Sequence, residues 1–226
     1  MGQRSAGAAK GASGRPRDRQ IDQSVIETTL AILDAEGYAG VSFEAVARRA
    51  GTSRPAVYRR WSTRAALVLA AVGERLDIPD PPDTGCTLCD IGESFDLFLA
   101  SYRTIRPESL SALYAECATD PDLRASYLET IIEPTRTAVG IAVDRAIARG
   151  DLRPDSNREV LLDLVGSLVH YRSMFSPDHL SDDDAWSAVE TLLRGAARDY
   201  PALLAHSEEL ERQHLDASHG QHHHPH

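Results

Sequence analysis

The sequence predicts an all-α protein in two parts. Between Val41 and Val68, fewer than thirty residues carry the end signals of two short helices and the start of a third. Beyond the proline-rich stretch IPDPPDTG, every segment has helical periodicity. No segment alternates polar and apolar residues for long enough to predict a strand.

The N-terminal part is expected to be a disordered basic arm over residues 1–17 and a helix-turn-helix domain over residues 18–76. Its first helix runs from about Asp22 to Glu36. Gly37 ends that helix, because glycine readily adopts the backbone conformation found just past helix ends.

A second, short helix begins after Ser42, whose hydroxyl can accept a hydrogen bond from a free backbone N–H of the first turn. Gly51 follows it and suits a tight turn. The spacing of the apolar residues predicts one buried stripe, formed by Phe43, Val46, Ala47 and Ala50.

Thr52 or Ser53 then caps a third helix, and Pro55 fits its first turn, where a missing N–H does no harm. Val57 and Trp61 point inward. The residues left facing outward are Arg54, Ala56, Tyr58, Arg59 and Arg60.

A fourth helix extends from Thr63 to about Leu76, with Arg64 in its first turn. The stretch IPDPPDTG follows, and its three prolines prevent a helix from crossing it. We therefore place the boundary between the two parts there and expect the second part to cover residues 77–204.

A short exposed helix with three arginines and a tyrosine suits the major groove of DNA. Arginine can bond guanine edges with two hydrogen bonds, and both residue types can bind phosphate. The alternative is a surface helix of an ordinary helical bundle. The residues expected to contact DNA are Ser42, Thr52, Ser53, Arg54, Pro55, Ala56, Tyr58, Arg59, Arg60, Thr63 and Arg64.

The arm can add a contact in the minor groove. Residues 13–17, SGRPR, resemble a short element that lies along A·T-rich minor grooves, which would place Arg15 and Arg17 there. The alternative is a solvated tail that supplies only general attraction.

The charge distribution agrees with a DNA-binding end. The net charge is −10. Residues 1–76 hold 12 Lys and Arg against 7 Asp and Glu, a net of +5, and residues 77–226 hold 12 against 27, a net of −15. A basic head on an acidic body fits a protein that touches DNA with one end only.

The second part is expected to contain five helices and to end in a disordered, His-rich tail over residues 205–226. Pro134 should kink or restart one of them, Gly150 should close it, and Pro201 should stop the last. The expected helices span about 88–105, 107–119, 122–149, 157–174 and 181–199.

The stretch AVARRAGTSRPAVYRRWSTRAALV resembles the DNA-binding signature of TetR-type transcriptional regulators. Arg64 stands where a lysine is usual in that signature, and Trp61 where a phenylalanine is usual. PDPPDTG and the stretch EPTRTAVGIAVDRAIARGDLRPDSNREVLLDLV resemble one subgroup of TetR-like C-terminal domains.

The resemblance implies a homodimer, most simply a repressor, that a small-molecule effector releases from a double-stranded DNA operator. Two reading heads would address two half-sites of a pseudo-palindrome. The last two long helices would pack against their copies, although both faces can also be buried inside one subunit. The expected interface residues are Leu161, Val165, Leu168, Trp186, Val189 and Leu193.

An effector cavity is expected in the second part, where polar tips stand on apolar walls. The alternative for His170 is an ordinary histidine in the core. The resemblance implies that an effector bound there would shift the fourth helix and so change the separation of the two reading heads. The candidate cavity residues are Phe98, Tyr102, Tyr114, Cys117, His170 and Met174.

Other classes have weaker support. Cys86 and Cys89 could form half of a zinc site or a redox pair, or could be small residues at a helix start. The terminal histidines could bind metal weakly. No phosphate loop, zinc-protease or nucleophile-elbow motif occurs, so we expect no enzyme and no cofactor; an enzyme or ligand-binding protein with an unmarked site and no specific DNA role is the alternative.

The compartment is expected to be the bacterial cytoplasm. No run of eighteen apolar residues is present, which argues against a membrane span, and no apolar segment opens the chain as a signal peptide would. Three cysteines, an odd number, favour a reducing environment.

Overall fold

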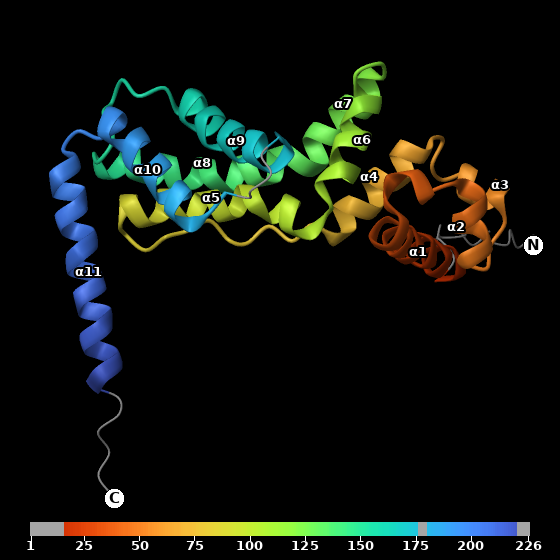
Figure 1. The fold of residues 1–226 in the computed structure, drawn as a ribbon, viewed down its shortest axis with the longest axis horizontal. Helices are drawn as coiled ribbons and strands as arrows, with labels where there is room; N and C mark the ends of the chain where they lie inside the picture. Colours follow the sequence, from red (N-terminus) through yellow and green to blue (C-terminus); the bar gives the residue numbers. More distant parts are fainter. Residues whose placement is uncertain (1–15, 176–179, 221–226) are drawn as a thin grey trace, which may run out of the picture. The chain divides into compact units, whose positions relative to one another are not determined.

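The computed structural model describes residues 16–175 and 180–220 (Figure 1). The chain divides into two compact units, residues 1–71 and 72–226. In the described ranges all regular elements are helical, apart from one isolated bridge between Leu152 and Ala197. The all-α prediction is confirmed.

From residue 16 onward, where the structure describes it, the first unit contains three helices and most of a fourth. α4 crosses the boundary between the units, which lies inside this helix and not at the proline-rich stretch that follows it. Buried aliphatic side chains from all four helices, such as Ile32, Val46, Val57 and Leu67, form the core of this unit. The helices are α1 (Pro16–Gly40), α2 (Phe43–Arg49), α3 (Arg54–Tyr58) and α4 (Arg64–Arg75).

α1 begins earlier than the sequence predicted, at Pro16 instead of Asp22. Proline is favoured in the first turn of a helix, so Pro16 can begin the helix even though it lies in the stretch expected to be disordered. At Gly37 the backbone takes φ 71° and ψ −172°, which breaks the helix before its last residues. The first helix was expected to end at Gly37; in the structure it kinks there and continues to Gly40.

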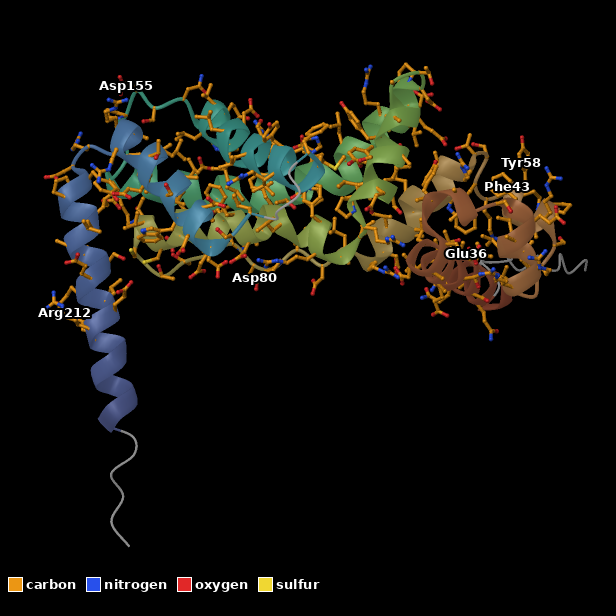
Figure 2. All side chains as sticks on the ribbon, in the orientation of Figure 1. Glu36, Phe43, Tyr58, Asp80, Asp155 and Arg212 are labelled. Atoms are coloured by element: carbon orange, nitrogen blue, oxygen red, sulfur yellow. The ribbon has the colours of Figure 1, made fainter. Side chains whose placement is uncertain are left out.

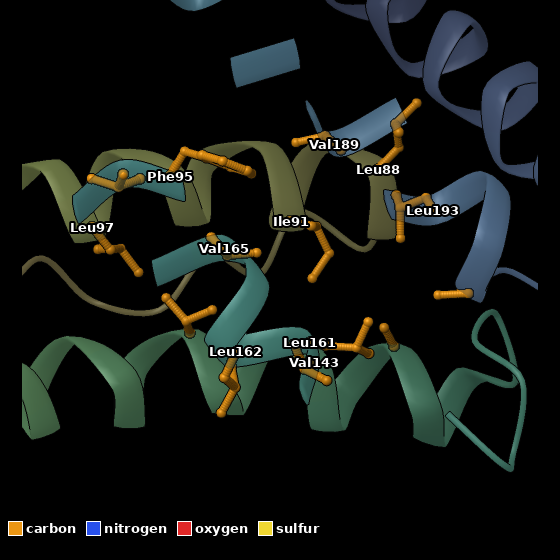
Figure 3. Packing of buried hydrophobic residues seen from close by; sticks show 14 of the residues in the cluster. Leu88, Ile91, Phe95, Leu97, Val143, Leu161, Leu162, Val165, Val189 and Leu193 are labelled. Carbon is orange, nitrogen blue, oxygen red and sulfur yellow. The ribbon is translucent and has the colours of Figure 1, made fainter. Parts of the chain in front are cut away.

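In the second unit α5 contacts α8, α9, α10 and α11. Leu88, Ile91 and Phe95 of α5 join a buried cluster with Val143 of α8 and Leu162 of α9 (Figure 3). None of the helices in the described part of the chain combines the length and apolarity needed to cross a membrane. The helices are α5 (Thr87–Thr104), α6 (Pro107–Cys117), α7 (Pro121–Tyr127), η1 (Leu128–Ile132), α8 (Glu133–Arg149), α9 (Arg158–Phe175), α10 (Asp182–Ala196) and α11 (Tyr200–Gly220).

The long helix expected over 122–149 is divided at the position of its proline. α7 passes into the π-helical turn η1, and α8 starts with Pro134 in its first turn. Gly150 closes α8 in the left-handed conformation, with φ 78°. Proline lacks the N–H that an α-helix needs there, which explains the local change of pitch.

α11 differs from the expected tail, because residues 205–220 are helical and only 221–226 lie outside the described residues. Pro201 does not stop a helix but lies in the first turn of this one. The Asp199 carboxylate caps it by accepting a hydrogen bond from the Ala202 N–H at 3.1 Å. Leu203 and Ser207 are buried on the same helix, so tertiary packing holds it in place.

Candidate nucleic-acid interface

α3 is a short helix whose conformation is fixed by its ends. The Ser53 hydroxyl accepts a hydrogen bond from the Ala56 N–H at 3.3 Å, and Pro55 lies in the first turn. Val57 is the buried residue of α3 and anchors it to the unit. Its other residues are therefore free to face a partner. The small side chain of Ala56 lets the backbone near the start of the helix approach that partner closely.

α2 and the turn after it hold α3 in position. The Ser42 hydroxyl accepts a hydrogen bond from the Ala45 N–H at 3.1 Å. Gly51 has φ 64°, a left-handed conformation that favours glycine, and the Thr52 N–H returns to the Ala47 carbonyl at 2.9 Å. These bonds form the tight turn that the sequence predicted.

An exposed tyrosine ring is supported from beneath by α2. Tyr58 is 58% exposed, and its ring packs edge-to-face with that of Phe43, with centroids 5.8 Å apart and planes at 88° (Figure 2). Phe43 itself is only half-buried, so the stripe predicted for α2 is buried through Val46 and Ala47 and not through Phe43. The contact between the two rings fixes the direction of Tyr58 while leaving its hydroxyl accessible.

The predicted DNA-contacting arginines fall into two groups. Arg54 and Arg59 are exposed and form no ion pair with another described residue. Arg60 instead pairs with Asp22 of α1 and donates to the Ala56 carbonyl at 3.1 Å. Arg64 lies over the Tyr38 ring, 4.4 Å from its centroid. Arg60 and Arg64 therefore already have structural partners.

Other members of the predicted set lie where they could touch DNA. Ser42, Ser53, Pro55 and Thr63 are exposed at helix starts, and Thr63 caps α4 by accepting a hydrogen bond from the Ala66 N–H at 3.0 Å.

α2 adds two neighbouring arginines near this surface. Arg48 on α2 is exposed and, within the described part of the chain, has no ion pair, whereas Arg49 beside it is paired with Glu36 at 2.6 Å. Arg15 lies outside the described residues, and the side chain of Arg17 is not described either.

The second unit contains a cavity of about 170 Å³ between α5, η1, α8 and α9. Phe98, Tyr102 and His170 line it, as predicted for an effector cavity. The Tyr102 hydroxyl and His170 Nδ1 are 2.5 Å apart and hydrogen-bonded. Burial raises the pKa of Tyr102 to about 12 and lowers the pKa of His170, so both groups are uncharged near neutral pH.

The other three candidates for this cavity lie elsewhere. Tyr114 is 50% exposed on α6 and packs against Tyr127, with ring centroids 5.6 Å apart. The Cys117 thiol is buried and donates to the Leu113 carbonyl at 3.4 Å. Met174 accepts a hydrogen bond from Ser111 at sulfur instead. Tyr114, Cys117 and Met174 therefore do not line this cavity.

Comparison with known proteins gives the same assignment for both units. Residues 25–71 match the family of bacterial regulatory proteins called the tetR family, and residues 81–192 match the tetracyclin repressor-like C-terminal domain. Together these two matches cover most of the chain. The chain belongs to the TetR family.

Individual TetR-family proteins resemble most of the chain. An uncharacterized HTH-type transcriptional regulator of Bacillus subtilis, YdeS, is 27% identical over 187 residues, covering 80% of this chain and 92% of that protein. The DNA-binding transcriptional repressor TetR of Mycobacteroides abscessus is 24% identical, covering 66% and 80%. The crystal structure of the TetR-family regulator SCO0332 has a TM-score of 0.60 at 28% identity, covering 78% of this chain and 98% of that one.

This TetR-family protein is a DNA-binding transcriptional regulator. A groove of about 770 Å³ runs between α9 and α10 of its second unit. Leu161, Val165 and Leu168, predicted for a dimer interface, line this groove. Val189 and Leu193 do not, because they are buried in the subunit's own core.

The exposed apolar residues of α9 lie one helical position away from the predicted ones. Leu161 and Val165 are also largely buried, and the residues before them, Val160 and Leu164, are about half exposed. Trp186, 43% exposed, faces Gly92 of α5 instead of the groove. Sequence reasoning missed Val160 and Leu164 because α9 is apolar on two neighbouring faces, and only packing decides which one is buried.

The cysteine pair lies at the start of α5. Cys86 is buried and its sulfur, 2.7 Å from that of Cys89, accepts a hydrogen bond from the Cys89 N–H at 3.3 Å. Burial, reinforced by the Cys86 contact, raises the pKa of Cys89 to about 11. This environment disfavours the thiolate that metal binding and redox chemistry need. The described residues contain no group of three or more potential metal-ligating side chains, and the histidines of 221–226 lie outside them.

Proposed function

We propose that the protein is a homodimeric repressor that binds a pseudo-palindromic operator and is released from it by a small-molecule effector. The observation that carries the proposal is the exposed, capped helix α3 with Arg54, Tyr58 and Arg59 on its outer face. Unpaired arginines held on a rigid short helix can read base edges without first breaking an internal contact. The Mycobacteroides abscessus relative, described as a repressor, supports the direction of control.

The dimer is supported by apolar surface on α9. Val160, Leu164, Tyr171 and Phe175 are exposed and recur on one side of this helix, beside the 770 Å³ groove. Soluble monomers rarely expose such a contiguous apolar patch. A second copy placed against α9 and α10 would cover it and would supply the second reading head that a palindromic operator requires.

Control by an effector is supported by packing inside the second unit. The last turn of α4 belongs to this unit, and there Gly73 faces Thr130 of η1; a Cβ at Gly73 would lie 2.6 Å from the Thr130 methyl. Ile131 and Ile132, the next residues of η1, line the 170 Å³ cavity. A ligand that moves η1 would therefore press on α4, which leads into the DNA-binding unit.

The test of the proposed function is selection of random-sequence duplexes by the purified protein at about 150 mM salt, a concentration at which weak non-specific binding is reduced. We expect an enriched pseudo-palindrome with two half-sites about one helical turn apart, or a multiple of that spacing. The matched control is the double variant Arg54→Ala/Arg59→Ala, which should stay folded and enrich nothing. Binding by the wild type without any enriched sequence would refute sequence-specific recognition.

A further inference from the structure

The cavity between α5, η1, α8 and α9 contains an unsatisfied polar group. Thr135 is 1% exposed, lines the cavity, and its hydroxyl has no hydrogen-bond partner among the described protein atoms. Buried hydroxyls in proteins are nearly always hydrogen-bonded, because an unsatisfied one destabilises the fold. Thr135 also follows directly after the π-helical turn and Pro134, and such turns are frequent at functional sites. The hydroxyl therefore points to a hydrogen-bonding occupant of the cavity.

The charged side chains at the cavity already have partners. Arg136 lines it, but its guanidinium is held by Glu159 at 2.5 Å and Asp163 at 2.6 Å, both on α9. Tyr102 and His170 bond to each other and are uncharged. A charged ligand would lose its hydration and gain no counter-ion, which is unfavourable in a buried site. The occupant should therefore be neutral.

The size and walls of the cavity indicate a single ring. Its volume of about 170 Å³ is several times the roughly 30 Å³ that one water occupies in the liquid, and a dry cavity of about 150 Å³ in another protein accommodates benzene. Phe98, Ile131, Leu162 and Val169 supply apolar walls. Gly166 lets the Phe98 ring approach α9, since a Cβ there would lie 3.1 Å from that ring.

We propose that this cavity binds a small, uncharged aromatic molecule that carries one hydroxyl group, with phenol as the simplest member of the class. The ring lies between the apolar walls, and its hydroxyl forms a hydrogen bond with the Thr135 hydroxyl. The proposal rests on the proposed function only in treating this ligand as the effector; binding itself can be tested without DNA.

Calorimetry and thermal unfolding of the full-length protein with phenol, benzene and benzoate at pH 7.5 test the proposal. Phenol should bind and raise Tm, benzene should bind roughly tenfold more weakly, and benzoate, which is charged at this pH, should not bind. Thr135→Val should raise Tm without ligand by about 2–4 °C, because it removes an unsatisfied hydroxyl. The same substitution should weaken phenol binding roughly tenfold and leave benzene binding unchanged.

Thr29→Val is the matched control. Thr29 is 0% exposed, but its hydroxyl donates to the Val25 carbonyl at 2.8 Å in the first unit. This substitution should lower Tm, because it removes a hydrogen bond that is already formed, and should leave phenol binding unchanged.

Three results would overturn the proposal. The first is equal phenol binding by wild type and Thr135→Val. The second is benzoate binding as tight as phenol binding. The third is that no aromatic compound binds and Thr135→Val lowers Tm, as expected for a hydroxyl bonded to water.

Operator release is a separate readout. If phenol binds through Thr135 but does not change operator affinity, the site stands and the effector role fails. If no operator is found by selection, the proposed function fails and the binding result is unaffected.

Discussion

The two groups of arginines in the DNA-binding unit lead to opposite expectations for two neighbouring substitutions. Arg54 is exposed and has no ion pair in the described structure, whereas Arg60 bonds to Asp22 and to the Ala56 carbonyl. Arg54→Ala should leave the free energy of unfolding within about 0.5 kcal/mol of wild type, as is usual for surface positions. If Arg54 reads a base edge, the same change should cost about 1–3 kcal/mol of binding at each half-site.

These energies translate into measurable affinities. A loss of 1–3 kcal/mol corresponds to a roughly 5- to 150-fold rise in Kd for one half-site, since about 1.4 kcal/mol is a factor of ten. Arg60→Ala should behave differently and destabilise the first unit by about 1–3 kcal/mol, because it removes hydrogen bonds to a charged group and leaves the carboxylate of Asp22 without this partner.

The assay is fluorescence anisotropy with the selected operator and with a random duplex, at several salt concentrations, beside thermal unfolding of each variant. Arg54→Ala should lose affinity for the operator only. Equal losses on both duplexes, together with a salt dependence reduced by about one ion per contact, would assign Arg54 to a phosphate and refute base reading. A lower Tm for Arg54→Ala than for Arg60→Ala would refute the division into two groups.

Four further predictions concern the second unit. Leu164→Glu, on the exposed face of α9, should convert the proposed dimer to monomer in sedimentation, whereas Ile141→Glu, an exposed position on α8, should leave that dimer intact; a dimer unchanged by both substitutions would remove α9 from the proposed interface. Gly73→Ala should lower Tm because its methyl meets Thr130, and Thr130→Ala should restore it; failure of the second change to rescue would mean that the two positions do not touch. Asp90→Ala should cost about 3–5 kcal/mol in denaturant unfolding, because this buried carboxylate bonds Arg149 at 3.2 Å and the Thr84 N–H at 2.8 Å, whereas Asp96→Ala, which breaks an exposed pair with Arg103, should cost at most about 1 kcal/mol. Since burial lowers the pKa of His170 in the folded state, its contribution to stability is present above the unfolded pKa of about 6.5 and is lost as the pH falls below it; Tm should decrease between pH 7.5 and 5.5, and less so in His170→Gln.

Features of the fold that depend on neighbours within a few residues could be predicted from the sequence. Ser42, Ser53 and Thr63 each cap the helix that follows, and each hydrogen bond joins residues three apart. Gly51 and Gly150 adopt the left-handed conformations that their positions required. Such interactions are encoded locally, so a single sequence is sufficient to locate them.

Features that depend on distant residues could not be predicted. The pairing of Arg60 with Asp22 and of Arg64 with Tyr38 joins positions far apart in the chain. The sequence placed both residues in the expected DNA-contacting set but could not show that each already has a partner. The same limit applies to α9, where the apolar pattern fits two faces and packing against the core chose the one with Leu161 over the one with Leu164.

Thr135 shows why the sequence could not point to every residue that lines the 170 Å³ cavity. Aromatic and histidine side chains such as Tyr102 and His170 attract attention in a sequence, because their chemistry suggests a pocket. A threonine beside a proline suggests only a break in a helix. Its hydroxyl becomes informative once burial and the missing partner are known, and both are properties of the fold.

The arrangement of the second unit offers the proposed effector control a short physical route. η1 has the cavity on one side, through Ile131 and Ile132, and the last turn of α4 on the other, through Thr130 and Gly73. α4 is anchored there a second time by Arg75, which donates to the Thr104 carbonyl at the end of α5 at 3.5 Å. Under the proposed effector control, a ligand in the cavity would need to move only one π-helical turn to shift the last turn of α4. If Gly73 were replaced by a larger residue, α4 would already be displaced, and we would expect the operator affinity of that variant to respond less to ligand.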